Sequence, residues 1–551
     1  MKQLSLLLVK SNFQFVAVQH RVYSRTRTDQ VTLALMNHHV DSLMDQLLNC
    51  EQFGPEQRTQ AVHQSRWILE ASDDELRQLI QSLLNCDAAI LNSSARSLVA
   101  AISKHLVERF RQRGQESGPE FEAETRRGLT DLYRHFGRES TFRHELLRIL
   151  VNNGQVDDLR AFVETIVDDP PADDTAAAQI LTPLFQKRLE PSTLFPRLLD
   201  GLSHVSLAAA ILDLSNFVTR NELVDQHPAT DRAAQLAMLL GEITQRLAQL
   251  EEQPAEDSVV DELNKKIAEG VALIVSLCDA LALIGDKSVV GKLFNVLELG
   301  HRRLRTEAAA ALARLGEERG VDELAKMAAE PVVRLRAIAY AEELDVLDKI
   351  EDQFLSSVAR AEAELVLHLA QPTQLGLPPT SCELVDEREQ YWPGYDEPVE
   401  CFLFRFGYHL GTNNYSNIGI AGPLAHAFTA DLADLPPNDI YAAFAGWQAE
   451  HADIYELLVE NLNETQRVEV ARLERRVRDS KYEQVVPLTL GLFFGDKVLV
   501  AAASREGTPG IAVADANEVF WYPSGKSERP LGPTEIYSIY KGRKLLRTFN
   551  T

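Results

Sequence analysis

At 551 residues the chain exceeds the length of one ordinary hydrophobic core, so we expect two or more domains. Its composition, 45% hydrophobic and 25% charged residues, excludes a mainly disordered protein. The formal net charge of −25 repels phosphate backbones, so we expect no nucleic-acid partner.

Residues 1–35 differ from the rest because basic residues outnumber acidic ones. The basic residues are Lys2, Lys10, Arg21, Arg25 and Arg27, against Asp29. Targeting segments have this character. We favour a disordered or misassigned leader, with Met36 as the alternative start because it opens the first strongly helical pattern.

Residues 36–370 predict a helical domain, because apolar residues recur at helical spacing. One such stripe is Leu76, Leu79, Ile80 and Leu83. The longest apolar stretch, 271–284, is shorter than a membrane helix and contains Asp279. We therefore expect no membrane-spanning segment.

An internal repeat lies in the middle of the chain. Gly285 and Gly316 each open a turn. Leu304 and Ala308 recur as Leu335 and Ala339 at the same spacing along the chain as the two glycines. A fixed period of this size, about 30 positions, is typical of stacked helix pairs. We expect the helices 289–299 and 303–315 to form one such pair.

Residues 303–318 read RLRTEAAAALARLGEE and residues 333–339 read VRLRAIA. Over about 270–347 the chain resembles HEAT repeats of the short, phycobilisome-lyase-like type. The family's arginine near the start of the second helix matches Arg305 and Arg336. The family's Gly-Asp turn matches Gly285 with Asp286 and Gly316 with Glu317. We expect these arginines to be structural and to pair with the acidic turn residues.

The segment 371–380 contains Pro372, Pro378 and Pro379 and predicts a linker. Residues 381–551 predict an α+β domain. We expect strands at 402–408, at 418–420, in a hairpin over 488–502, and at 511–513, 519–522 and 536–540. We expect one helix to begin near Asn438 and to carry Ile440, Phe444, Trp447, His451, Ile454 and Leu458 on one side, and a second, charged helix over 464–479.

A group of aromatic residues follows in a turn with proline and glycine, a context that often leaves aromatics exposed for binding. We predict a partner-binding surface formed by Tyr391, Trp392, Tyr395, Asp396 and Tyr415. The alternative is a loop pinned onto the helical array.

No catalytic, cofactor-binding or metal-binding motif is present in the sequence. His451 shares its predicted helix face with Phe444 and Trp447, so we interpret it as a core histidine. At the C-terminal end, Lys541, Arg543 and Lys544 form either a solubilising terminus or a grip for an acidic partner, including the chain's own helical domain.

The five cysteines are dispersed and odd in number, which argues against a disulfide framework and favours the cytoplasm. They are Cys50, Cys86, Cys278, Cys382 and Cys401.

The sequence therefore predicts a mainly α protein: an irregular HEAT-like α-solenoid followed by an α+β domain. The favoured function is a non-catalytic scaffold that binds another protein, with no cofactor, no nucleic acid and no membrane. The resemblance implies a first alternative, a bilin-lyase-like or cofactor-chaperone activity. A second alternative is an enzyme in the C-terminal domain that uses His409, His426 or His451. The oligomeric state stays open.

Overall fold

The computed structural model describes residues 39–91, 96–114, 121–138, 140, 142–186, 190–252, 260–449, 451–525 and 529–550. The chain divides into two compact units, residues 1–315 (unit 1) and residues 316–551 (unit 2), and each is described by itself. The predicted leader, 1–35, and the alternative start at Met36 lie outside the described residues. The predicted linker, 371–380, joins a helix to a strand within unit 2, and the domain limits expected from the sequence stay a prediction.

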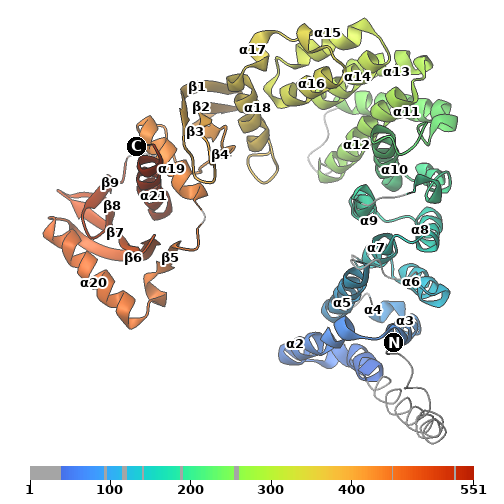
Figure 1. Cartoon of the computed structure of the whole chain (residues 1–551), viewed down its shortest axis with the longest axis horizontal. Coiled ribbons are helices and arrows are strands. Elements are labelled where there is room, and N and C mark those ends of the chain that lie inside the picture. The colour runs from blue at the N-terminus through green and yellow to red at the C-terminus, as the bar shows by residue number, and fades with distance from the viewer. Residues whose placement is uncertain are drawn as a thin grey trace, which may run out of the picture. The chain divides into compact units, whose positions relative to one another are not determined.

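The described residues of unit 1 form helices and turns (Figure 1). Residues 39–49 are helical. The later α-helices are α2 Pro55–Gln64, α3 Asp73–Leu84, α4 Ala88–Leu91, α5 Arg96–Gly114, α6 Ala123–His135, α7 Arg143–Asn153, α8 Val156–Asp168, α9 Asp174–Leu181, α10 Val205–Arg220, α11 Ala233–Glu252, α12 Val260–Ile284, α13 Val290–Leu297 and α14 Arg302–Arg314. Short 3-10 helices lie at Cys50–Gln52, Ser65–Glu70, Thr182–Phe185, Pro191–Thr193, Arg197–Ser203, Thr230–Arg232 and Lys287–Val289.

Helix α3 shows how the sequence sets a helix boundary. The hydroxyl of Ser72 accepts a hydrogen bond from the backbone N–H of Glu75, and the Glu75 carboxylate accepts one from the backbone N–H of Ser72. This capping box satisfies amide groups that the first helical turn leaves without a partner. The predicted apolar stripe from Leu76 to Leu83 is buried.

Helices of unit 1 pack against the next helix and against the next but one. Examples of the longer step are α5 with α7, α6 with α8, α7 with α9, α10 with α12, α11 with α13 and α12 with α14. Helices such as α7 and α12 therefore bury their apolar residues against neighbours that come before and after them in the chain, which a single helix cannot do alone.

Helix α12 corrects the expectation about membrane segments. Residues 263–284 are long and apolar enough to cross a membrane, because the helix begins well before the apolar stretch read from the sequence. Half of the apolar window is buried, and α10, α11 and α14 pack on the helix. Asp279 forms an ion pair with Arg220, and Ser276 donates a hydrogen bond to Asp213. These contacts are those of a core helix, and the fold is compatible with a soluble protein.

Unit 2 begins with helices and continues with two antiparallel sheets. The helices are α15 Glu318–Met327, α16 Pro331–Glu343, α17 Asp352–Leu355, α18 Ser357–Leu369, α19 Pro437–Gln448, α20 Glu464–Asp479 and α21 Pro533–Phe549, with 3-10 helices at Leu347–Lys349 and Val459–Asn461. The first sheet has the order β1 Ser381–Gln390, β2 Val399–Leu410, β3 Asn413–Ala421 and β4 His426–Ala427. The second has the order β5 Ile454–Leu458, β6 Glu483–Phe493, β7 Asp496–Arg505, β8 Thr508–Ala514 and β9 Val519–Pro523. The predicted division into mainly α and α+β parts is confirmed.

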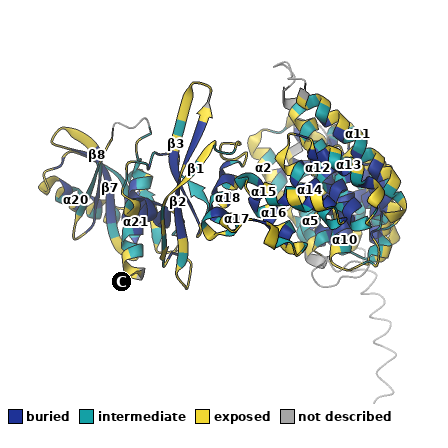
Figure 2. Cartoon of the chain, turned by 90° about the horizontal axis from the view of Figure 1, so that it is seen from above, coloured by how far each residue is buried: buried dark blue, intermediate teal, exposed yellow. Residues whose placement is uncertain are grey.

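Each sheet is covered by one helix on each face. In the first sheet, Phe402, Phe404 and Phe406 pack against α18, while Cys401 and Leu403 pack against α19. In the second sheet, α20 covers one face and α21 the other. The central strands β2 and β7 are therefore buried on both sides, which Figure 2 shows, and α19 and α21 lie between the sheets in Figure 1.

Two predicted elements are wrong. Residues 536–540, expected as a strand, belong to α21 because their buried residues Ile536, Tyr537, Ile539 and Tyr540 follow helical spacing. The helix expected to run from Asn438 to Leu458 begins at Pro437 and ends at Gln448, and Ile454 to Leu458 form β5. The predicted helix 464–479 and the hairpin of β6 and β7 are confirmed.

The two helix-and-sheet layers are copies of one pattern. The order α18, β1 to β4, α19 (the first module) recurs as α20, β6 to β9, α21 (the second module). Residues 435–446 read LPPNDIYAAFAG, and the equivalent residues 531–542 read LGPTEIYSIYKG. Tyr441 and Tyr537 are both fully buried, and each hydroxyl donates to a backbone carbonyl of its own sheet. Sequence reasoning missed this duplication, although the paired Pro, Ile, Tyr and Gly residues carried the signal.

The inner helices meet at equivalent glycines. A Cβ added at Gly446 would overlap the carbonyl oxygen of Ser538, and one added at Gly542 would overlap that of Ala442. Residues 442 and 538 are themselves equivalent in the duplication, so the contact is reciprocal, as in a two-fold pair of antiparallel helices. Only glycine lets the two backbones come this close.

We predict that Gly446→Ala destabilises unit 2 by at least about 2 kcal/mol, because overpacking at a backbone contact outweighs the helix propensity of alanine. Thermal unfolding of the full chain measures the effect. Gly291→Ala in α13 is the control, since open space surrounds Gly291. Equal melting temperatures for the two variants would contradict a close helix contact.

The repeat register differs between the two helices of a pair. Leu293, Val296 and Leu297 of α13 match Leu324, Met327 and Ala328, which are all buried and follow at the interval that separates Gly285 from Gly316. In contrast, the buried residues Leu304, Ala308, Ala309 and Leu312 of α14 match Val333, Ala337, Ile338 and Ala341, at an interval two positions shorter. The predicted counterparts of Leu304 and Ala308 are wrong: Leu335 is half-buried and Ala339 is exposed.

The shorter register arises around the connection between the paired helices, because Val333 follows Ala328 two positions sooner than Leu304 follows Leu297. Residues with positive φ angles directly after the second helix of each pair support the same shorter register. They are Gly285, Gly316 and Asp345, and the second interval is again two positions shorter than the first. Asp is among the few residues other than glycine that tolerate this conformation.

This register places Arg334, not Arg336, at the position of Arg305. Arg334 is 3% exposed and donates to the carbonyls of Ala328, Ala329 and Ala359 and to Glu362 at 2.6 Å. It therefore ties the α15–α16 connection to α18. Arg336 is exposed and donates to the Tyr340 hydroxyl.

We predict that Arg334→Ala lowers the free energy of unfolding by roughly 2–4 kcal/mol, because three carbonyls and a carboxylate lose a buried donor. The matched variant Arg336→Ala removes an exposed arginine two residues away and should cost less than about 1 kcal/mol. Urea denaturation of both variants is the measurement, and the reverse order would contradict the shorter register.

Candidate functional site

Four of the five predicted partner-binding residues fall on the connection between β1 and β2, which we call the aromatic loop (residues 391–396). Tyr391 and Tyr395 are 42% and 43% exposed, and Asp396 is exposed. Gly394 has a φ of +89°, which allows the loop to turn back between the strands. Two tyrosines and a carboxylate are thus presented together at the surface.

Trp392 does not belong to this surface. It is 1% exposed, its indole N–H donates to the Gln448 side chain, and its ring meets Tyr441 edge-on. The indole is instead the anchor of the loop, and this corrects its prediction as a binding residue. The physical reason is that α19 ends at Gln448, whose side chain offers a half-buried acceptor beside the indole.

Further contacts fix the loop at both ends. The side chain of Asn550 accepts from the backbone N–H of Tyr391 and donates to its carbonyl. The Tyr395 hydroxyl donates to the carbonyl of Pro423 at 2.8 Å. A loop fixed in this way loses little conformational freedom on binding, which favours affinity.

Tyr415 lies elsewhere. It is on β3 opposite Tyr408, while the aromatic loop adjoins Val399 at the other end of β2. Nine residues of strand separate the two places, or roughly 30 Å. The Arg529 guanidinium covers the Tyr415 ring at 4.0 Å, and its N–H donates to the carbonyl of Ser416. The structure therefore does not bring Tyr415 together with the loop.

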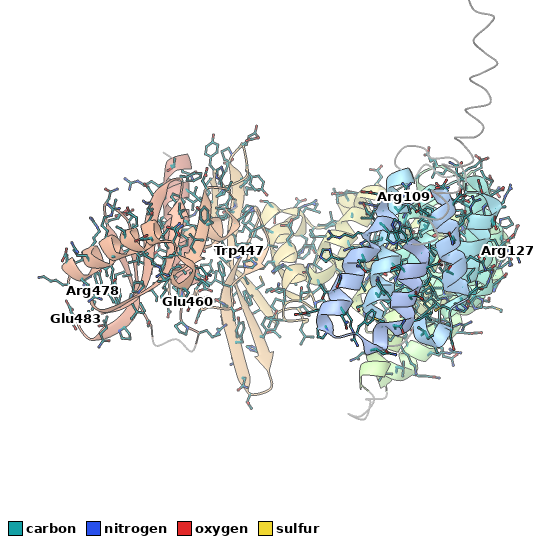
Figure 3. The ribbon with its side chains drawn as sticks, turned by 90° about the horizontal axis from the view of Figure 1, so that it is seen from below. Arg109, Arg127, Trp447, Glu460, Arg478 and Glu483 are labelled. Carbon is teal, nitrogen blue, oxygen red and sulfur yellow. The ribbon has the colours of Figure 1, made fainter. Side chains whose placement is uncertain are left out.

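The candidate histidines are also separate. His426 on β4 stacks on Trp447 with 3.9 Å between ring centres, and burial followed by the nearby His368 lowers its pKa to about 4. Trp447, labelled in Figure 3, is 45% exposed rather than part of the core. His451 lies beyond the end of α19, is exposed and contacts Phe494, so its interpretation as a core histidine is wrong. His409 is exposed near the end of β2.

In the part of the chain that the structure describes, no three His, Cys, Asp or Glu side chains form a group suited to a metal ion. All five cysteines are free thiols. Burial raises the pKa of Cys382 to about 12 and that of Cys401 to about 11, so both thiols are protonated at neutral pH.

The basic residues near the C-terminus bind acids of unit 2 itself. Arg543 donates two hydrogen bonds of 2.7 Å to Asp439, which links α21 to the first turn of α19. Lys544 donates to Asp515 at 2.7 Å, and Tyr540 donates to the same carboxylate at 3.0 Å. These side chains hold the two modules and the β8–β9 turn together, so they form neither a solubilising terminus nor a grip for another molecule.

Unit 1 contains a cavity of about 510 Å³ beside α7 and α9. Its most buried charged residue, Arg143, is 3% exposed, lies 4.0 Å from the centre of the Tyr133 ring and pairs with Asp169. The Tyr133 hydroxyl donates to the Asp169 carbonyl. The Nε atom of Arg143 is buried and has no hydrogen-bond partner in the described part of the chain, so this guanidinium is only partly satisfied.

Comparisons with family models, with curated proteins and with solved structures found no match to this chain.

We predict that Asp515→Asn removes a pH-dependent contribution to the stability of unit 2. Burial alone would raise the pKa of Asp515, but hydrogen bonds from Lys544, the backbone N–H groups of residues 517 and 518, and Tyr540 outweigh it and lower the pKa to about 2. The carboxylate therefore stabilises the fold above about pH 4, and this contribution is lost as the pH falls to about 2.

Thermal unfolding between pH 2 and pH 7 tests this. The variant should be less stable at pH 7 by roughly 1–3 kcal/mol and should show a shallower fall in stability between pH 4 and pH 2. Asp479→Asn, at an exposed position on α20, is the control. Parallel pH curves for wild type and Asp515→Asn would contradict the prediction.

Proposed function

We propose that this protein is a non-catalytic scaffold that binds another protein. Its helices up to residue 370 would form an irregular α-solenoid of HEAT-like pairs, and its C-terminal part would add a second contact surface. The observation that carries the proposal is the recurrent packing of helices in unit 1 against the next helix or the next but one, as in α6 with α7 and α8, and α11 with α12 and α13. Repeats that stack in this way build extended surfaces, which such proteins use for binding.

The HEAT-like assignment gains support from the corrected register. Leu304 and Arg305 are followed by alanine at 308, and Val333 and Arg334 are followed by alanine at 337. Both helices thus carry an aliphatic residue, an arginine and an alanine at the same places. The Arg334 contacts give this arginine the structural role that the resemblance implies.

The aromatic loop is the proposed contact surface of the C-terminal part. Tyrosine is enriched at the energetic centres of interfaces, and Tyr391 and Tyr395 are exposed on a loop that is already fixed. The five free cysteines support a reducing compartment, and we propose the cytoplasm. The partner would be a protein, because the net charge of −25 disfavours nucleic acid.

We predict that gentle purification of the tagged full chain from its own cells recovers specific protein partners, identified by cross-linking and mass spectrometry. Partners that bind through the aromatic loop should be recovered by the double variant Tyr391→Ser with Tyr395→Ser at roughly tenfold lower yield. Truncating an exposed interface aromatic costs about 1–2 kcal/mol of binding free energy.

The control variant is Tyr455→Thr with Phe494→Asn, which removes two aromatics of similar exposure at another place in unit 2. Recovery of the monomer alone would refute the scaffold proposal. Equal recovery by the loop variant and the control would refute only the role of the aromatic loop.

A further inference from the structure

The duplicated modules differ at one sheet edge. In the second module, β5 lies beside β6 and pairs with its residues 489–493, so that β6 is an interior strand. In the first module, β1 occupies the position of β6 but is the edge strand of its sheet in the described part of the chain. The first module therefore lacks the strand that the second one has.

The pairing registers define which part of β1 corresponds to the β5-binding part of β6. Residues 489–493 are the last five paired positions of β6 and lie opposite residues 500 to 496 of β7. Residues 386–390 are likewise the last five of β1, opposite residues 403 to 399 of β2. In both strands the register shifts just before this segment, at Leu384–Asp386 in β1 and at Pro487–Thr489 in β6. Residues 386–390 of β1 therefore have the same pairing register as residues 489–493 of β6, which pair with the additional strand β5.

The side chains of this edge indicate the charge of a neighbour. Arg388 points towards α19, because its guanidinium lies over Tyr441 at 4.2 Å and donates to Asn438. Glu387 and Glu389 alternate with it, so they lie on the α18 face, where both are exposed. Glu389 lies directly opposite Glu400 of β2. Like charges in this cross-strand position repel, and a cation beside them relieves the repulsion.

We propose that the β1 edge at Asp386–Gln390 binds an extended segment of a partner protein by strand addition, with lysine or arginine beside Glu387 and Glu389. The added strand would run antiparallel to β1, as β5 does to β6. Backbone hydrogen bonds would supply affinity and the glutamates would select basic side chains. A second copy of this edge is a poor occupant, because its own glutamates would face those of the first. This inference rests on the proposed scaffold function and names a surface and partner chemistry for it.

The test uses the full chain and the blocked synthetic peptide Val-Lys-Val-Lys-Val-Thr-Val, with a second peptide in which glutamate replaces both lysines. Titration calorimetry should show the lysine peptide binding at least about tenfold more tightly than the glutamate peptide, with affinity falling as salt rises. The variant Glu387→Lys with Glu389→Lys should reverse this order. Glu460→Lys with Asp479→Lys, two exposed acids near or on α20, should not.

A third peptide, methylated on alternate backbone nitrogens of the edge that faces β1, should lose binding, because strand addition needs those donors. Circular dichroism checks that the variants fold, and Glu389→Gln, a milder change, should weaken the lysine peptide in the same direction. Undetectable binding at millimolar peptide, equal affinity for both peptides, insensitivity to methylation, or a dimer through β1 would each overturn the edge proposal. If partners still co-purify with the chain in that event, the scaffold proposal stands and only this inference fails.

Discussion

The contact between α19 and α21 at Gly446 and Gly542 sets the arrangement of the modules in unit 2. Each helix is the inner cover of its own sheet, so the distance between the helices fixes the distance between the sheets. The backbones touch at two places related by the duplication, and a side chain at either glycine would hold the helices apart. The ion pair of Arg543 with Asp439 crosses the same contact. These glycines and this ion pair are among the contacts that join two modules whose sheets do not share a strand.

The duplication also shows where the two copies have diverged. His426 and Trp447 stack on each other in the first module, while Phe520 and Arg543, at the equivalent positions of the second, face each other with the guanidinium 5.7 Å from the ring centre. The same two backbone positions thus hold a ring against a ring in one copy and a cation against a ring in the other. Arg543 reaches Asp439 as a result, and Trp447 stays 45% exposed. The Arg543 pair therefore links the two modules, whereas the Trp447 pair lies within the first module.

How much of this was predictable depends on the range of each interaction. Local patterns predicted α20 and the β6–β7 hairpin, because capping, charge and turn residues act within a few positions. The helix register of α16 was mispredicted because a glycine-to-glycine interval does not reveal that α16 begins two positions sooner than that interval implies. The strand at Ile454–Leu458 was missed because its apolar residues continue the spacing of α19, and only pairing with β6 decides between the two structures.

In the candidate site, too, local sequence predicted which residues are neighbours, while distant residues decide which of them are buried. Sequence reasoning grouped Tyr391, Trp392 and Tyr395 correctly as neighbours but treated them as alike. Their environments differ because Gln448 and Asn550, which are 56 and 159 residues away from the loop residues they bind, determine which ring is buried. Composition cannot show such partners. The acidic residues of β1 are visible in the sequence, but their presence has two explanations: they bind a basic segment, or they protect the sheet edge from unwanted pairing. The second module distinguishes these roles, since there the equivalent edge carries a neighbour, and a position that one copy fills with a strand is a physically competent site in the other.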